Sequence, residues 1–103
     1  MKVCGLTTRI TMAEDYYEPR DSLSHDWLNY LHSQEISPLL IPNILIDLET
    51  YINKIDLLII TGGEDIITNI NTENKLYSIR DNNEFSLLEN AISLGIPVLG
   101  ICR

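Results

Sequence analysis

The chain has 103 residues, which is enough for one small domain and too few for two. Hydrophobic residues make up 45% of it and charged residues 21%, so we expect a packed core rather than disorder. The formal net charge is −8 and the 7 basic residues are scattered along the chain, which argues against nucleic acid and anionic membranes as partners.

The apolar runs of the chain are short. None approaches the ~18 residues that a membrane span requires, and residues 1–10 are too short an apolar run for a secretory signal, so we expect a cytoplasmic protein. Cysteines of a reducing compartment are usually free thiols. Cys4 lies inside an apolar segment and is expected to be structural, whereas Cys102 lies at the end of one.

Strands and helices are expected to alternate along the chain. Residues 2–8 predict a strand, and residues 11–21, which have neither helical nor strand periodicity, predict a loop. Residues 24–34 predict a helix that begins near Ser24, because apolar residues recur there at three- and four-residue spacing. The apolar residues of this pattern are Leu23, Trp27, Tyr30 and Leu31.

A second strand is predicted over residues 38–41, followed by an amphipathic helix. The apolar positions of that helix are Leu45, Leu48, Tyr51, Ile52 and Ile55. Residues 56–61 are continuously apolar over their middle, which is typical of a central parallel strand buried on both faces.

Asp81 with Glu84 resembles a capping box and predicts the start of the next helix, which Gly95 and Pro97 end. Its expected apolar face consists of Phe85, Leu87, Leu88, Ala91, Ile92 and Leu94. Residues 96–101 then predict a further buried strand. Right-handed crossovers between these strands give a mostly parallel sheet covered on both faces, so the predicted fold is a flavodoxin-like α/β three-layer sandwich.

Unusual residues follow two of the predicted strands, at residues 61–65 and 100–103. Ligands of such sheets bind outside the carboxyl ends of the strands. Residues 100–102 fit the first half of a nucleophile elbow, with Cys102 as nucleophile. The N–H groups of Gly63 and Arg103 are the natural donors of an oxyanion hole. The ordinary alternatives are a buried cysteine at a strand end and a simple glycine turn.

Three segments together resemble class I glutamine amidotransferases. They are Thr61-Gly62-Gly63-Glu64-Asp65, Arg80-Asp81 with Glu84, and Gly95-Ile96-Pro97-Val98-Leu99-Gly100-Ile101-Cys102-Arg103. The resemblance spans essentially the whole chain and is closest to the free-standing γ-glutamyl hydrolase branch, such as γ-glutamyl-GABA hydrolases. Residues 16–21, ahead of Trp27, are in addition similar to γ-glutamyl-CDP-amidate hydrolases.

The resemblance implies that Cys102 attacks the γ-carbonyl of glutamine or another γ-glutamyl amide, and that water hydrolyses the resulting thioester. It implies an oxyanion hole made by the N–H groups of Gly63 and Arg103, a substrate-binding turn at Gly62, and no metal or organic cofactor. The segment around Arg80 matches a stretch that positions the helix before the elbow. Residues 66–69 lack the proline that often follows the glycine turn in the hydrolase branch, so the acceptor side of the pocket is expected to differ from that branch.

The family's catalytic His and its Glu partner belong to the second half of the domain. We therefore expect residues 1–103 to be the N-terminal half of a class I glutamine amidotransferase-like domain, ending after the nucleophile elbow and inactive alone. Two alternatives stay open. One is a glutaminase subunit that delivers ammonia to a synthetase partner, and the other is a non-catalytic binding module on the same fold.

The remaining candidate residues have ordinary interpretations. His25 and His32 lie near the ends of a predicted helix, where an exposed imidazole is the usual outcome, and neither matches the family's general base. Arg20 either holds a substrate carboxylate or lies with Glu18 and Asp21 on a solvated loop. We favour the solvated loop.

Overall fold

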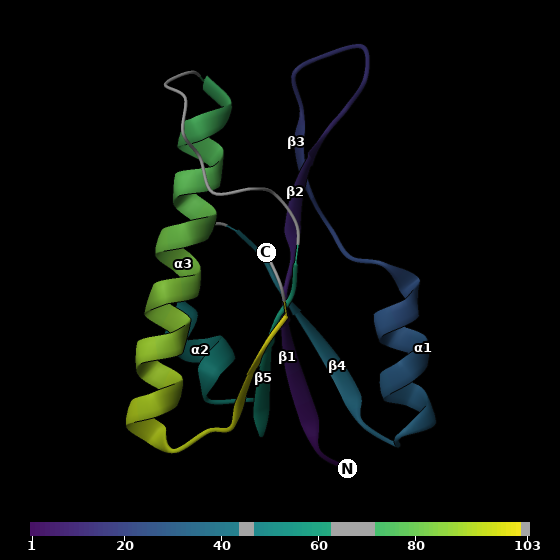
Figure 1. The fold of residues 1–103 in the computed structure, drawn as a ribbon, viewed down its shortest axis with the longest axis vertical. Coiled ribbons are helices and arrows are strands. Elements are labelled where there is room, and N and C mark those ends of the chain that lie inside the picture. Colours follow the sequence, from purple (N-terminus) through teal and green to yellow (C-terminus); the bar gives the residue numbers. More distant parts are fainter. Residues whose placement is uncertain (44–46, 63–71, 102–103) are drawn as a thin grey trace.

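A computed structural model describes residues 1–43, 47–62 and 72–101 (Figure 1). The elements in chain order are β1 (Val3–Thr7), β2 (Arg9–Met12), β3 (Pro19–Ser22), α1 (His25–Ser33), β4 (Ser37–Ile41), α2 (Leu48–Ile52), β5 (Leu57–Ile60), α3 (Thr72–Leu94) and β6 (Val98–Gly100). The main sheet is parallel throughout and has the order β4-β1-β5-β6. Numbered as they occur along the chain, these strands read 2-1-3-4, which is the flavodoxin-like order.

Helices cover both faces of this sheet, with α1 on one side and α2 and α3 on the other (Figure 1). The predicted α/β three-layer fold is therefore confirmed. The strands predicted over residues 2–8, 38–41, 56–61 and 96–101 and the helix over residues 24–34 are all present, and their ends differ from the prediction by at most two residues. No helix in the described ranges combines the length and the apolar character that crossing a membrane requires.

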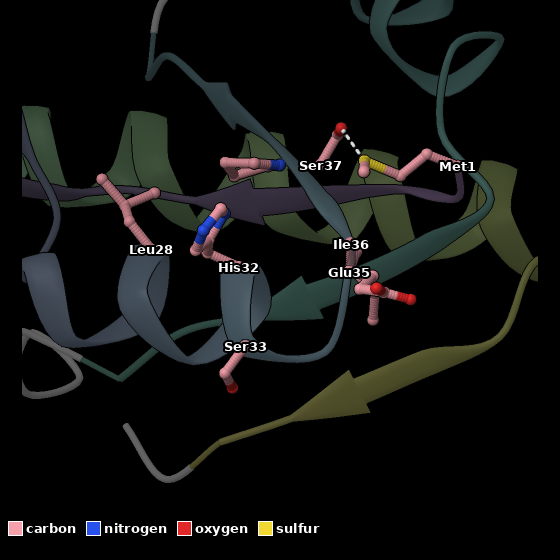
Figure 2. A pocket seen from close by; sticks show the side chains of 8 residues that line it. Met1, Leu28, His32, Ser33, Glu35, Ile36 and Ser37 are labelled. Atoms are coloured by element: carbon pink, nitrogen blue, oxygen red, sulfur yellow. Dashed lines mark hydrogen bonds between the residues drawn. The ribbon is translucent and has the colours of Figure 1, made fainter.

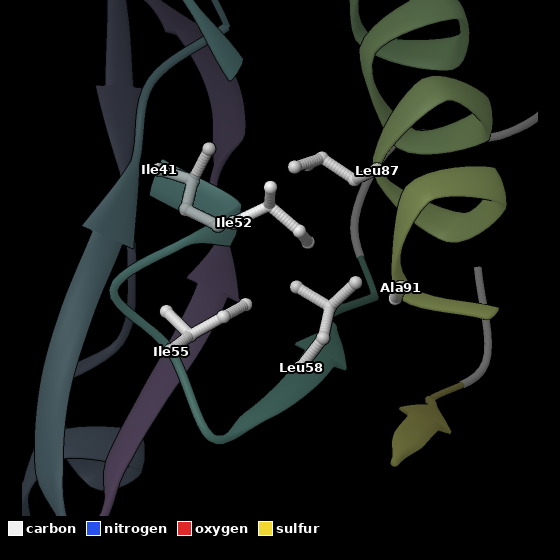
Figure 3. Close-up of a cluster of buried hydrophobic side chains, with 6 residues drawn as sticks. All are labelled: Ile41, Ile52, Ile55, Leu58, Leu87 and Ala91. Atoms are coloured by element: carbon white, nitrogen blue, oxygen red, sulfur yellow. The ribbon is translucent and has the colours of Figure 1, made fainter. Parts of the chain in front are cut away.

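Two hydrophobic clusters fill the space between the layers. One lies between the sheet and α2 and α3 (Figure 3) and is made of Ile41, Ile52, Ile55, Leu58, Leu87 and Ala91. The other lies on the α1 side and is made of Cys4, Leu6, Leu31 and Ile59. Consecutive residues of a strand point to opposite faces, so Leu58 and Ile59 place β5 in both clusters. This is the two-sided burial that the continuous apolar run predicted.

The loop predicted over residues 11–21 is confirmed only for residues 13–18, because its two ends belong to β2 and β3, which form an antiparallel hairpin. Its register pairs Arg9 with Ser22 and Met12 with Pro19. Most of its side chains are exposed and only Ile10 is buried among them, so the alternation that marks a half-buried strand is absent. Backbone pairing and polar contacts hold this hairpin, and neither leaves a periodic apolar pattern in the sequence.

The predicted start of the last helix is also wrong. α3 begins at Thr72, so Asp81 and Glu84 lie inside it rather than at a capping box. No glycine or proline occurs between residues 72 and 94, and the helix continues through the Asp-x-x-Glu pattern because nothing breaks it there. α2 conversely ends before its apolar pattern does, and Ile55 is buried beyond that end. Leu45, the first residue of the pattern, lies outside the described residues.

Several apolar side chains that were expected in the core are exposed. Tyr30 is 58% exposed, Phe85 65% and Ile92 68%, whereas Leu31, Leu87 and Ala91 are buried as predicted. The apolar face of α3 that meets the sheet is therefore narrower than the face that the sequence predicted.

Both α1 and α3 end with a residue in the left-handed region. Gly95 has a φ of 72° and follows α3, and Glu35 has a φ of 60° and follows α1. In each case the next N–H reaches back over the turn, from Ile96 to the Ala91 carbonyl at 2.8 Å and from Ile36 to the Leu31 carbonyl at 2.9 Å. Gly95 adopts this conformation without a steric cost, whereas Glu35 carries a Cβ atom that opposes it.

Replacing Glu35 with glycine is expected to raise the free energy of unfolding by about 0.5–1 kcal/mol, because the Cβ atom that opposes the left-handed conformation is removed. Urea denaturation of the wild-type and variant proteins measures this difference. Gly95→Ala is the matched control and is expected to destabilise by about 1 kcal/mol. A loss of stability in Glu35→Gly would contradict the interpretation.

Candidate functional site

The order of the strands reverses between β1 and β5, and the carboxyl ends of these strands meet at one edge of the sheet. Ligands of open α/β sheets bind at such a switch point. Thr7 ends β1 and Thr61 follows β5, and both are buried. The Thr61 N–H donates to Thr7 Oγ1 at 2.9 Å, and the Thr61 hydroxyl donates to the Thr7 carbonyl at 2.8 Å. These hydrogen bonds join the two strand ends where the half-buried Gly62 begins the predicted glycine turn.

The strand β6 brings the second predicted motif to the same edge. Ile60 pairs with Gly100, and the Ile101 N–H donates to the Ile60 carbonyl at 2.8 Å. Ile101 directly precedes Cys102, and Ile60 lies two residues before Gly62. The two motifs that the sequence singled out therefore leave the sheet from neighbouring strands.

Three of the predicted site residues lie outside the described ranges, namely Cys102, Gly63 and Arg103. Their roles as nucleophile and oxyanion donors stay predictions. The described residues fix only the two strand ends from which these three residues extend.

A buried arginine holds the main chain at the end of β5. Arg80 of α3 is 0% exposed, and its Nη2 donates to the Thr61 carbonyl at 2.8 Å and to the Gly62 carbonyl at 3.4 Å. The Glu84 carboxylate accepts from Arg80 Nε at 3.3 Å and from Nη2 at 3.2 Å. A buried cation needs such a partner, because an unpaired charge in the interior is strongly destabilising.

The sequence predicts Arg80 only as part of a stretch that positions the helix before the elbow, and its contact with the turn was not predicted. A signal for that contact exists in the spacing. Arg80, Glu84, Leu87 and Ala91 follow one another at intervals of four, three and four, which places all of them on one helix face. Since Leu87 and Ala91 are buried, the charged pair on the same face is buried as well.

Asn83 is a second buried polar residue of α3. It is 2% exposed, and neither atom of its amide group has a hydrogen-bond partner in the described part of the chain. Leaving a buried amide unpaired costs about 1–3 kcal/mol. The adjacent residue Asn82 is exposed, so the pair offers a direct comparison of the two environments.

A polar cluster anchors the β2–β3 hairpin to the same edge of the sheet. The Asn43 amide donates to the Thr8 carbonyl at 2.8 Å and to Asp21 Oδ1 at 2.9 Å, and the Asn43 N–H donates to Asp21 Oδ2 at 3.0 Å. Thr8 in turn donates to the Ile41 carbonyl at 2.9 Å. The hairpin therefore projects from the carboxyl edge with its base bonded to the end of β4 (Figure 1).

Arg20 lies on this hairpin and is bonded within it. Its Nε donates to Glu18 Oε2 at 2.6 Å, and its Nη2 donates to the Tyr16 hydroxyl at 2.7 Å. The hydrogen bond from Arg20, followed by that from Tyr16, lowers the pKa of the Glu18 carboxyl below its ordinary value. Asp21, the other expected neighbour, bonds to Asn43 instead. Arg20 is thus solvent-exposed and paired with Glu18, and its contact with a substrate carboxylate, the less favoured alternative, stays a prediction.

Cys4 is enclosed in the cluster on the α1 side and is 0% exposed. Burial raises the pKa of its thiol to about 11, so the reactive thiolate is scarce at neutral pH. Its surroundings are those of a structural cysteine, as the sequence predicted.

Both histidines of the chain lie on α1. His32 lines a hollow of about 600 Å³ with Met1, Leu28 and Ser37 (Figure 2). This hollow lies at the amino ends of β1 and β4, so the sheet separates it from the switch point. His25 is exposed at the start of α1.

Comparisons with known proteins relate the chain to a family and to a curated relative. A model of the family described as Peptidase C26 matches residues 2–103. A γ-glutamyl-CDP-amidate hydrolase of Campylobacter jejuni subsp. jejuni serotype O:2 is 32% identical over 102 residues, which cover 96% of this chain and 50% of that protein. The chain thus spans about half the length of the curated relative that it matches.

At pH 8, a maleimide is expected to leave Cys4 unmodified in the native protein, because the side chain is buried and, at a pKa of about 11, about one thiol in a thousand is ionised. Mass spectrometry of the labelled peptides measures this. The Cys102→Ser variant isolates Cys4, which should react only after denaturation. Rapid labelling of the native variant would show that Cys4 is accessible.

Replacing Asn83 with leucine is expected to raise the free energy of unfolding by about 1 kcal/mol, since two unpaired polar atoms leave the interior. Asn82→Leu on the exposed side of the same turn is the control and should change it by less than about 0.5 kcal/mol. Chemical denaturation of both variants provides the comparison. Equal effects at the two positions would argue against an unsatisfied amide at Asn83.

Proposed function

The chain belongs to the peptidase C26 family, and we propose that it carries the nucleophile half of a cysteine hydrolase that cleaves γ-glutamyl amide bonds. The observation that best supports this is the pairing of β5 with β6. Because Ile101 is bonded to Ile60, the cysteine that follows Ile101 and the glycines that follow Thr61 extend from adjacent strand ends. A nucleophile and an oxyanion hole must be neighbours of this kind.

In the proposed reaction, the Cys102 thiolate attacks the γ-carbonyl carbon of glutamine or of another γ-glutamyl amide. The N–H groups of Gly63 and Arg103 stabilise the oxygen that becomes negative. The C–N bond then breaks, the amine leaves with a proton, and a γ-glutamyl thioester remains on the sulfur. Water hydrolyses the thioester, which releases glutamate and restores the thiol.

This chemistry also needs a base that accepts the thiol proton and returns a proton to the amine. His32 lies at the opposite end of the sheet, and His25 is exposed on the surface of α1. We propose that the base is an imidazole outside residues 1–103, oriented by a carboxylate, and that residues 1–103 alone do not hydrolyse the amide.

Apolar side chains that are exposed on β6 and α3 support the proposal that residues 1–103 form half of a domain. Val98 of β6 packs against α3, whereas Leu99 and Ile101, which point to the other face, are 53% and 37% exposed. On the side of α3, Phe85 and Leu88 line a hollow of about 170 Å³ with Ile60. We propose that the second half of the domain covers these surfaces, as helices cover the other strands.

We propose that the substrate is a γ-glutamyl amide whose leaving group is a substituted amine rather than ammonia. The 32% identity to a γ-glutamyl-CDP-amidate hydrolase supports this choice over free glutamine. The hairpin stands at the edge of the sheet, where such a group would extend, and Arg20 is its candidate contact for an anionic part of the substrate. The salt bridge with Glu18 limits that role to substrates that can compete with a carboxylate.

Changing Cys102 to alanine in the full-length protein is expected to reduce the release of glutamate from γ-glutamyl amides and glutamine by at least about a thousand-fold, because no thioester can form. Cys4→Ala is the matched control. It removes the other thiol of residues 1–103 and should leave kcat of the folded enzyme within about twofold, although it lowers stability.

The outcomes separate the alternatives. Activity that survives in Cys102→Ala would overturn Cys102 as the nucleophile. Hydrolysis of glutamine only after a synthetase is added would favour the ammonia-delivering subunit. Full-length wild-type protein that binds a γ-glutamyl compound without cleaving it would favour the binding module.

A further inference from the structure

The main chain beyond β5 is held by a side chain from a distant part of the sequence. The last carbonyl of β5 that bonds to β6 is that of Ile60, which accepts from the Ile101 N–H. The next two carbonyls, of Thr61 and Gly62, accept from the Nη2 atom of Arg80 at 2.8 and 3.4 Å. The guanidinium group therefore continues the hydrogen bonding of the strand into the turn.

This support acts where the main chain has little stiffness of its own. Gly62 is followed by a second glycine, and residues without a Cβ atom adopt many backbone conformations. A contact with the Gly62 carbonyl therefore removes freedom that the sequence itself leaves to this peptide. Arg80 is suited to this because it is 0% exposed and is itself fixed by two hydrogen bonds to Glu84.

The geometry of a peptide links this contact to the reaction. In a trans peptide the carbonyl and the following N–H point in opposite directions. A donor that holds the Gly62 carbonyl consequently restricts the plane of the peptide that follows Gly62. The N–H of that peptide is the proposed oxyanion donor, and it belongs to Gly63, which lies outside the described residues.

We propose that Arg80 is a positioning residue that orients the glycine turn for oxyanion binding, with Glu84 as the residue that orients Arg80. The inference rests on the proposed function, since it assigns a role within that reaction. A lysine cannot replace Arg80, because an ammonium group lacks the planar set of donors that contacts two carbonyls and a carboxylate together.

The first test measures the turn itself. In the full-length protein labelled with ¹⁵N, Arg80→Lys is expected to shift or broaden the amide resonances of Gly62 and Gly63, while resonances of α1 stay in place. Glu89→Gln, an exposed change on the same helix, is the control and should move none of them. Unchanged glycine resonances in Arg80→Lys would overturn the proposal whether or not the protein is a hydrolase.

The second test measures hydrolysis of a γ-glutamyl amide. Arg80→Lys is expected to lower kcat by about ten- to a hundred-fold, below the 10²–10³ that complete loss of an oxyanion donor costs, with KM within about threefold. Glu84→Gln should lower kcat less than Arg80→Lys does. A kcat per folded enzyme equal to that of wild type would reduce Arg80 to a stabilising role.

The two tests can contradict the proposed function and the role of Arg80 independently of each other. The glycine resonances could shift in Arg80→Lys although the wild-type protein hydrolyses no γ-glutamyl amide. In that case Arg80 orients the turn, but the turn does not serve this reaction. The wild-type protein could instead be active while Arg80→Lys leaves both the glycine resonances and kcat unchanged. The proposed function would then stand, and Arg80 would not be a positioning residue.

Discussion

The burial of β5 on both faces is the constraint on which the rest of the structure depends. Leu58 enters the cluster shared with α2 and α3, and Ile59 enters the cluster shared with α1. A slip of one residue would exchange these faces, so β1 and β6 pair with β5 in a single register. That register determines where each strand ends, and it places Thr61 beside Thr7 and Ile101 beside Ile60. The candidate site follows from this alignment of strand ends.

The layers could be predicted from the sequence because their signals are local and apolar. The run that became β5 needs burial on both faces, and Ser24 caps α1 as its residue type suggested. The β2–β3 hairpin could not be predicted, because its stability comes from main-chain pairing and from the bonds between Asn43 and Asp21, which are 22 residues apart. A contact between polar residues so far apart has no periodic signature.

The candidate site could likewise be predicted only in part from the sequence. Strand ends that carry Gly62 and precede Cys102 were recognisable, since glycine and cysteine at those positions depart from a simple apolar strand. The residues that hold these ends were not. Thr7 and Thr61 are ordinary strand residues in the sequence, and a charged Arg80 is expected on a solvated face until its spacing to buried Leu87 is considered. Chemistry-bearing residues are visible in a sequence, whereas the polar contacts that orient them depend on the fold.

The place of β1 in the sheet has a consequence for biosynthesis. β1 leaves the ribosome before both of its neighbours in the sheet, because it pairs with β4 and β5, which lie more than 30 and 50 residues later. At about 5–20 residues per second, β1 waits several seconds for its second neighbour. During that interval Cys4 and Leu6, which end fully enclosed, have no cover from β5. Apolar surface exposed in this way favours aggregation, and the exposure ends before any part of the nucleophile motif is synthesised.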